Sequence, residues 1–185
     1  MKIALQLIII FALNFICSCD KGKNNPDSCN GKTTRRNVKI AVDADAVEID
    51  TVPTIIGVAE IGQLEVPESD KNSARQNIEK RVFQITAKVH KISQHRDGDW
   101  KVKLTDENDN FINCEAPNLG CKYIGSSIFY PQMLASRNWI IENKNDLVGK
   151  TVTVKGIAFI DIDHKYPRNA AENELELHPI LDIHF

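Results

Sequence analysis

The sequence has only one long apolar run, and that run is too short to cross a membrane as a helix. It covers residues 3–16 (IALQLIIIFALNFI), whereas a membrane-spanning helix needs about 20 apolar residues. No later stretch is a better candidate. We therefore expect a body without a transmembrane helix, and the apolar run must have another role.

The motifs of several enzyme classes are also missing. GVAEIG, at residues 57–62, has neither the spacing nor the following Lys of a phosphate-binding loop, and no Gly-x-Ser-x-Gly nucleophile elbow occurs. The cysteine spacing matches no zinc pattern. The formal net charge of −2 disfavours non-specific nucleic-acid binding but allows a local basic face. These absences favour a binding module, while leaving enzymatic activity open.

The start of the chain has the features of a secretory signal. Lys2 precedes the apolar run, which ends in Ile16-Cys17-Ser18-Cys19. This ending resembles the bacterial lipoprotein box, in which the signal is removed in front of the cysteine that carries the lipid. The resemblance implies that residues 1–18 are a signal peptide and that Cys19 is lipidated with acyl chains such as palmitate. A disulfide across one residue is geometrically poor, and a metal site needs more ligands.

A polar segment without apolar periodicity follows the predicted lipidation site. Residues 19–37 are rich in Asn, Lys and Gly, a composition typical of a disordered tether. The sequence thus predicts a protein of the bacterial cell envelope, attached to a membrane by an N-terminal lipid, with its body outside the cytoplasm.

Three cysteines remain after the predicted cleavage, and export would permit disulfides. Because the number is odd, at most one internal pair forms. We expect this pair to be Cys114–Cys121, across a short turn, with Cys29–Cys121 as the alternative.

The rest of the chain predicts a mainly β fold. Residues 38–80 contain Pro53, Gly57, Gly62 and Pro67, which oppose a long helix. We expect an extended segment with a helical turn or two near 57–64, packed on a body formed by residues 81–185.

Apolar residues of the body alternate with a period of two, as in half-buried strands. Asp97-Gly98 is a strong hairpin signal, Gly156 indicates a bulge, and Pro179 indicates a bulge or an edge. The expected elements are strands at 81–93, 100–104 and 111–116, a helix within 126–145, and strands at 150–163 and 174–185. This order predicts a five-stranded OB-like Greek-key barrel with one helix between strands 3 and 4. A plain antiparallel sheet with one helix is the alternative.

Several segments resemble a group of uncharacterised bacterial exported proteins. They are DADAVEIDTVPT, GDWKVKL, EAPNLGC, GIAFIDIDH and NELELHPILDI, within residues 43–185. The bodies of that group resemble OB-type barrels and end in a similar IELHP strand. This chain departs from the group at Trp100-Lys101 and at Cys114. The resemblance implies fold and export, and it implies no activity.

One candidate site lies on the last two predicted strands. Asp161 and Asp163 share one strand face, as do Glu176 and His178. If the strands pair, these four side chains (with His164 nearby) could bind a divalent metal and activate water for phosphodiester hydrolysis. The simpler interpretation is a solvated face with a His bonded to nearby backbone. No other cofactor is expected.

A second candidate site is a basic face on the first two strands of the body. Lys88, His90, Lys101 and Lys103 point outward, whereas Trp100 shares its face with core residues. OB barrels bind ligands on this side, through cationic and stacking contacts. We therefore expect a lipid-anchored, non-enzymatic binding module whose ligand is an oligosaccharide, a nucleic acid or a protein. The alternative is a metal-dependent hydrolase that uses the acidic cluster.

Overall fold

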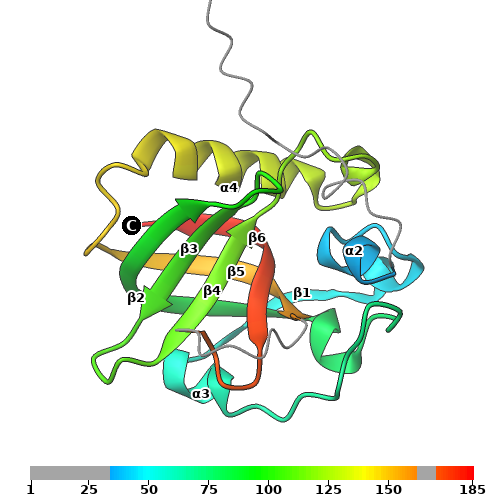
Figure 1. Ribbon diagram of the computed structural model, residues 1–185, viewed down its shortest axis with the longest axis horizontal. Coiled ribbons are helices and arrows are strands. Elements are labelled where there is room, and N and C mark those ends of the chain that lie inside the picture. The colour runs from blue at the N-terminus through cyan, green and yellow to red at the C-terminus, as the bar shows by residue number, and fades with distance from the viewer. Residues whose placement is uncertain (1–33, 162–169) are drawn as a thin grey trace, which may run out of the picture.

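Five strands close into a barrel with the strand order of an OB fold. The computed structural model describes residues 34–161 and 170–185. Its barrel strands are β2 (Arg81–Gln94), β3 (Trp100–Thr105), β4 (Phe111–Ala116), β5 (Thr151–Ile160) and β6 (Leu175–His184). They follow one another as β2-β3-β4-β6-β5, and β5 pairs with β2 to close the barrel (Figure 1). The β4–β6 pair is parallel and the other barrel pairs are antiparallel. The predicted OB-like barrel is confirmed.

Strict alternation along the strands separates the barrel core from its outer face. On β3, Val102 and Leu104 are fully buried in the core, whereas Lys101 and Lys103 point outward. Trp100 packs partly buried against the same core. This period of two is what the sequence shows, because successive strand residues point to opposite faces.

Two interruptions of the strands are local irregularities rather than strand ends. The β5–β6 register shifts on both sides of Gly156. A Cβ at Gly156 would lie 2.9 Å from Leu177 Cβ and 3.1 Å from the Pro179 carbonyl, so β6 approaches too closely for any side chain there. The Pro179 peptide bond is cis.

The helix α4 (Tyr130–Asn143) lies between the third and fourth barrel strands, as predicted, with Pro131 in its first turn. It packs on β6, where the Ser136 hydroxyl donates to the Ile180 carbonyl at 3.0 Å. Near its end, Trp139 meets Phe185 edge-to-face at 5.1 Å.

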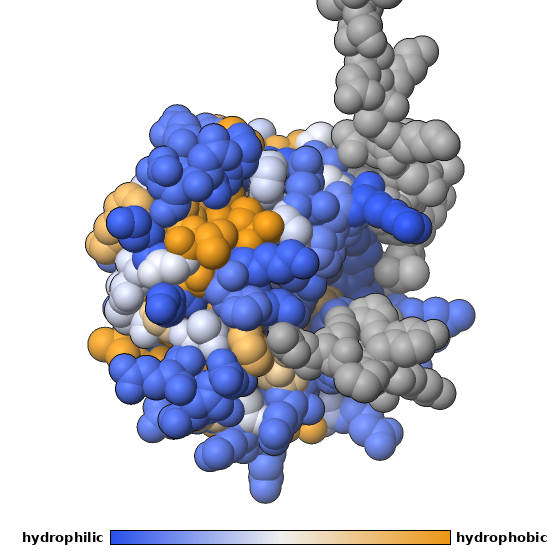
Figure 2. All heavy atoms as spheres, turned by 60° about the vertical axis from the view of Figure 1, so that its left-hand side comes forward, coloured by the Kyte–Doolittle hydropathy of each residue, from blue (hydrophilic) through white to orange (hydrophobic). Residues whose placement is uncertain are grey.

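Figure 2, which brings this side of the molecule forward, shows apolar residues gathered in one patch among hydrophilic ones. No helix among residues 34–161 and 170–185 is long and apolar enough to cross a membrane.

The segment before the barrel is short elements joined by extended chain. It contains α2 (Thr34–Lys39), η1 (Ala44–Glu48), β1 (Asp50–Ile55), α3 (Val58–Gly62) and η2 (Asn77–Lys80), and the short η3 (Ile124–Ser126) precedes α4. β1 pairs in parallel with the start of β2. The helical turn expected near 57–64 corresponds to α3.

The ordered body begins earlier than the sequence predicted. Residues 34–37, assigned above to a disordered tether, form most of α2, where Arg35 and Arg36 are buried. Arg35 binds both carboxylate oxygens of Glu79 and the Ile160 carbonyl. The predicted signal peptide, Cys19 and the tether as far as residue 33 lie outside the described residues.

The predicted Cys114–Cys121 disulfide is wrong, because Cys114 is a free thiol. Cys114 points into the barrel core, whereas Cys121 belongs to a second apolar cluster between the barrel and the segment before it. The two side chains thus lie on opposite sides of the sheet. Burial raises the pKa of the Cys114 thiol well above its usual value. The alternative Cys29–Cys121 pair involves Cys29, which lies outside the described residues.

Candidate functional site

The outer face of β3, β4 and β6 carries most of the polar chemistry of the barrel. The residues that point outward here are Asp99 (directly before β3), Lys101, Lys103, Phe111, Asn113, Glu115, Glu176 and His178. Part of this face is buried near Lys39 of α2 and the rest is open to solvent. We call the two parts the covered half and the open half.

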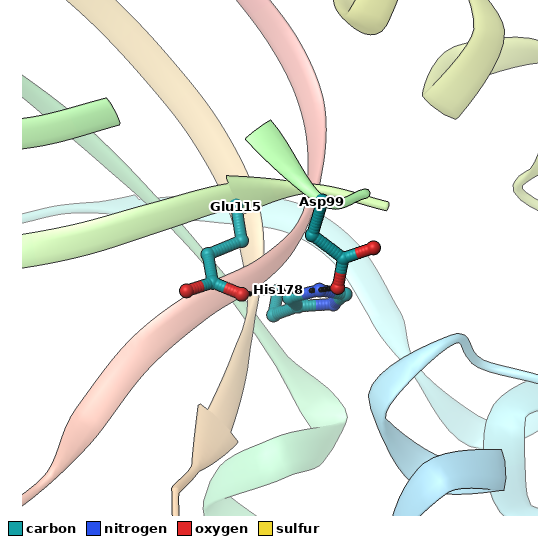
Figure 3. A group of neighbouring side chains, drawn as sticks. All are labelled: Asp99, Glu115 and His178. Carbon is teal, nitrogen blue, oxygen red and sulfur yellow. Dashed lines mark hydrogen bonds and ion pairs between the residues drawn. The ribbon is translucent and has the colours of Figure 1, made fainter. Parts of the chain in front are cut away.

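The covered half brings together Asp99, Glu115 and His178, here called the acid–histidine cluster. One ligand atom from each lies within 4.8 Å of the others, and all three residues are buried. They come from the start of β3, from β4 and from β6 (Figure 3). The three residues are far apart in the sequence. Glu115 and His178 lie close together because β4 and β6 pair in the barrel.

His178 is held by both ring nitrogens. Its Nδ1 lies 2.7 Å from the backbone carbonyl of Lys39, which can only accept, so Nδ1 carries the proton. Its Nε2 faces Asp99 Oδ2 at 3.3 Å and Glu115 Oε2 at 3.6 Å. Burial, followed by the Lys39 ammonium, lowers the pKa of His178 despite the neighbouring Asp99.

The ammonium of Lys39 lies among three carboxylates. Its Nζ is 2.9 Å from Glu115 Oε2, 3.7 Å from Asp99 Oδ2 and 3.8 Å from Glu176 Oε1. Burial alone would lower the pKa of Lys39, but the charges of Glu115, Glu176 and Asp99 raise it well above its usual value. Lys39 therefore remains charged and is the principal counter-ion of the covered half, with Lys101 2.7 Å from Glu115 Oε1.

The pKa values of the carboxyl groups in the covered half are shifted in opposite directions. Burial would raise the pKa of Glu115, but Lys39, His178 and Lys101 lower it to about 2. Burial would likewise raise the pKa of Asp99, but its hydrogen bond with His178 and the charges of His178, Lys39 and Arg36 lower it. Burial and then the nearby Glu115 raise the pKa of Glu176 well above 4.5. Glu176 Oε1 is buried with no hydrogen-bond partner among the described residues.

Among the described residues, the group of possible metal ligands shares only His178 with the metal site expected from the sequence. Glu176 and His178 share a strand face, as their spacing predicted, but both are buried rather than solvated. Asp161, at the end of β5, is not part of the one group of possible ligands found among the described residues. Asp163 and His164 lie outside those residues. Sequence reasoning missed Asp99 and Glu115. Asp99 is two residues before the outward Lys101, and Glu115 lies between the core residues Cys114 and Ala116, so the strand alternation places both on the outer face.

The open half contains the basic face expected from the sequence. A bulge in β2 places His90 between the register pairs Val89–Leu104 and Lys91–Lys103. His90 therefore meets Phe111 of β4 edge-to-face, with ring centroids 5.0 Å apart. The ammonium of Lys103 lies 6.0 Å from the centre of the same ring.

The four predicted ligand-binding residues have different surroundings. Lys88 and His90 are exposed, and Lys103 is half-buried beside Phe111. Lys101 turns toward Glu115 and so belongs to the covered half. Lys91 and Phe111 were not among the predicted four, and the bulge that aims Lys91 outward has no clear sequence signal.

A cavity begins where Phe111 ends the open half. Its volume is about 310 Å³, and Phe111, Asn110, Val58 and Gly62 contribute to its walls. The partly exposed ring of Phe111 therefore connects the basic face with a hollow against α3.

Comparisons with known proteins found similarity among solved structures alone. No protein-family model and no curated protein matches the chain. Among solved structures, an OBody, AM3L09, bound to hen egg-white lysozyme is 12% identical over 58% of this chain and 82% of that one, with a TM-score of 0.39. The asparaginyl-tRNA synthetase of Entamoeba histolytica is 12% identical over 73% of this chain, with a TM-score of 0.42. Its complex with asparaginyl-adenylate has a TM-score of 0.41, 12% identity and 72% coverage. This chain spans about a quarter of the length of either synthetase chain (24% and 23%).

Proposed function

We propose that this protein is a lipid-anchored binding module of the bacterial envelope and that the open half of its barrel holds an anionic polymer strand. The anchor rests on the lipoprotein-like sequence that ends at Cys19. Several acyl chains would anchor the body firmly, because each buried methylene contributes about 0.8 kcal/mol. The binding role rests on the open half, and it requires no catalytic residue.

The observation that carries the binding role is the pair Lys91 and Lys103. These lysines are direct partners across the β2–β3 ladder. Two ammonium groups therefore lie side by side on the open half, where one acidic group of a ligand could contact both. Phe111 lies on the same face, beside Lys103 and His90. A cation pair next to a partly exposed ring suits a strand that alternates charged groups with flat rings.

Two ligand classes have this chemistry, namely single-stranded nucleic acid and an anionic oligosaccharide. Both present acidic groups at regular spacing, and both present ring faces that could lie on Phe111. A protein ligand fits less well, because the centres of protein interfaces are depleted in charged residues.

The alternative, a metal-dependent hydrolase built on Asp161, Asp163, Glu176 and His178, receives less support. Glu176 and His178 are almost wholly buried, and substrate must reach a hydrolytic metal. Asp161 takes no part in the described group of possible ligands.

Binding can be measured with the full chain in detergent micelles and labelled oligomers, either single-stranded oligo-dT or a sulfated oligosaccharide. Lys91→Gln and Lys103→Gln should each weaken binding of oligo-dT and reduce the salt dependence of log K by about 0.7. Phe111→Ala should weaken it by about 5–150-fold, the equivalent of 1–3 kcal/mol. Preference for the sulfated oligomer would assign the ligand to the oligosaccharide class.

The matched control is Lys150→Gln, which removes one exposed lysine from the turn before β5. It should bind as the wild type does. Equal losses for Lys150→Gln and Lys103→Gln would indicate attraction to total charge and would refute a built site.

The anchor has its own test, which is the intact mass of the membrane-extracted protein beside a Cys19→Ala variant. We expect a chain that starts at Cys19 and carries diacylglyceryl and acyl groups, all lost in the variant. A mass without lipid would refute the anchor and leave the binding role to be judged separately.

A further inference from the structure

We propose that Asp99, Glu115 and His178 form a site for a zinc-like divalent cation and that the ammonium of Lys39 occupies its open side as a built-in competitor. The site belongs to the covered half of the face, so the proposal does not rest on the polymer-binding role. Its donors would be His178 Nε2 and one carboxylate oxygen each from Asp99 and Glu115.

The two distances from the histidine to its neighbouring donor atoms fit a tetrahedral ion. Zinc bonds to nitrogen and oxygen are about 2.1 Å long, so the ligand atoms of a tetrahedral site lie about 3.4 Å apart. Here His178 Nε2 lies 3.3 Å from Asp99 Oδ2 and 3.6 Å from Glu115 Oε2. All three side chains converge on one point in Figure 3.

The histidine is oriented as metal-bound histidines are. Its Nδ1 donates to the Lys39 backbone carbonyl at 2.7 Å, which orients the ring and directs Nε2, whether it carries a lone pair or a proton, at the carboxylates. Metal-ligating histidines almost always donate their second ring nitrogen to a carbonyl or carboxylate in this way. Without a cation or a proton at Nε2, that lone pair faces two oxygens that also carry lone pairs.

A buried oxygen without a partner supplies the independent sign of a cation site. Glu176 is 2% exposed, and its Oε1 has no hydrogen-bond partner among the described residues. This atom lies 3.8 Å from Lys39 Nζ, the ammonium that we place at the open side of the site. At this distance Lys39 Nζ cannot donate a hydrogen bond to it.

Lys39 also defines the entry path. Its side chain is 18% exposed, whereas those of Asp99, Glu115 and His178 are 2% exposed or less. A metal ion would enter as the Lys39 side chain swings out, which exchanges one cation for another. If Lys39 fills the site more than about nine-tenths of the time, the apparent metal affinity falls by at least about tenfold.

The test measures binding of Zn²⁺ and Co²⁺ to the full chain and to Lys39→Gln. The variant should bind one ion per chain at least about tenfold more tightly than the wild type. Bound Co²⁺ should show the strong visible absorption of tetrahedral coordination. Adding His178→Gln to Lys39→Gln should abolish this signal, whereas adding Asp161→Asn, the matched control, should leave it unchanged.

Three results would overturn the proposal. They are unchanged affinity in Lys39→Gln, binding that survives His178→Gln, and thiolate-to-cobalt charge transfer, which would place the ion on cysteine. If Lys39→Gln fails to fold, the visible spectra of the wild type and of the single His178→Gln variant are compared at millimolar Co²⁺. A tetrahedral spectrum in the wild type alone supports the site, and equal spectra refute it.

Discussion

Replacing Glu79 with Gln should destabilise the protein strongly, because Glu79 neutralises a buried arginine. Glu79 is 0% exposed. Its Oε2 accepts from Arg35 at 2.9 Å and from the Gln76 amide at 2.8 Å, and its Oε1 accepts from Arg35 at 2.5 Å and from the Ile160 amide at 2.9 Å. A Gln side chain loses the charge and turns one acceptor into a donor that faces other donors.

The expected loss follows from the burial of both partners. Removing one partner of a buried ion pair typically costs about 3–5 kcal/mol, since the other charge stays buried without compensation. Arg35 cannot lose its proton, and its side chain is 4% exposed. For a chain of this length, that loss corresponds to a fall in Tm of roughly 6–20 °C.

Urea unfolding followed by the fluorescence of Trp100 and Trp139 would measure the change. The double variant Arg35→Met/Glu79→Met should lose less stability than Glu79→Gln alone, because it leaves no unpaired charge. Lys80→Gln, which breaks a more exposed ion pair with Glu48, is the control and should shift the midpoint little. Exposed ion pairs contribute less than about 1 kcal/mol. A loss of unfolding free energy in that range for Glu79→Gln would refute the view that the buried Arg35–Glu79 pair holds α2 on the barrel.

Four further predictions concern buried groups. Glu115→Gln should lower the free energy of unfolding at neutral pH by up to about 3 kcal/mol. The loss should shrink as the pH falls from 4.5 toward 2, because in this range Glu115 binds a proton in the unfolded chain but stays ionised in the folded one. Glu176→Gln should raise stability at neutral pH and have no effect below about 4.5, because folded Glu176 keeps a proton that the unfolded chain releases; urea midpoints at pH 3, 5 and 7 that move with the same sign in both variants would contradict this assignment. Gly156→Ala should cost about 1–3 kcal/mol through overpacking, whereas Gly125→Ala, where nothing lies within 4 Å, should unfold near the wild-type temperature. Cys114 should resist thiol reagents until the chain unfolds, as a comparison with Cys114→Ser would show, and rapid labelling of the folded protein would contradict its burial.

The barrel could be predicted because its information is local. Val102 and Leu104 alternate with Lys101 and Lys103 within one strand, and neighbouring residues of a strand must face opposite sides. Turn residues such as Gly98, which has a φ of 87°, divide the strands. The order of strands and helix then restricts the topology to very few choices.

The burial of residues on the outer face could not be predicted, because it depends on contacts between residues that are distant in the sequence. Arg35 lies in a polar segment whose composition is that of a tether, yet Glu79 and Ile160 bury it. Asp99, Glu115 and His178 meet only when the barrel closes. Period-two patterns show which residues point outward, and they do not show what covers them.

The division of the face into two halves links α2 to the proposed binding of an anionic strand. Lys101 and Lys103 are two residues apart, about 7 Å along the strand, yet one neutralises Glu115 and the other lies half-buried beside Phe111. The acidic residues of the covered half therefore lie within about one Debye length, roughly 8 Å, of the open half. Without the charge of Lys39 they would repel an anionic strand, and a divalent ion in its place would restore the balance. The helix that covers one half thus sets the electrostatic potential of the other.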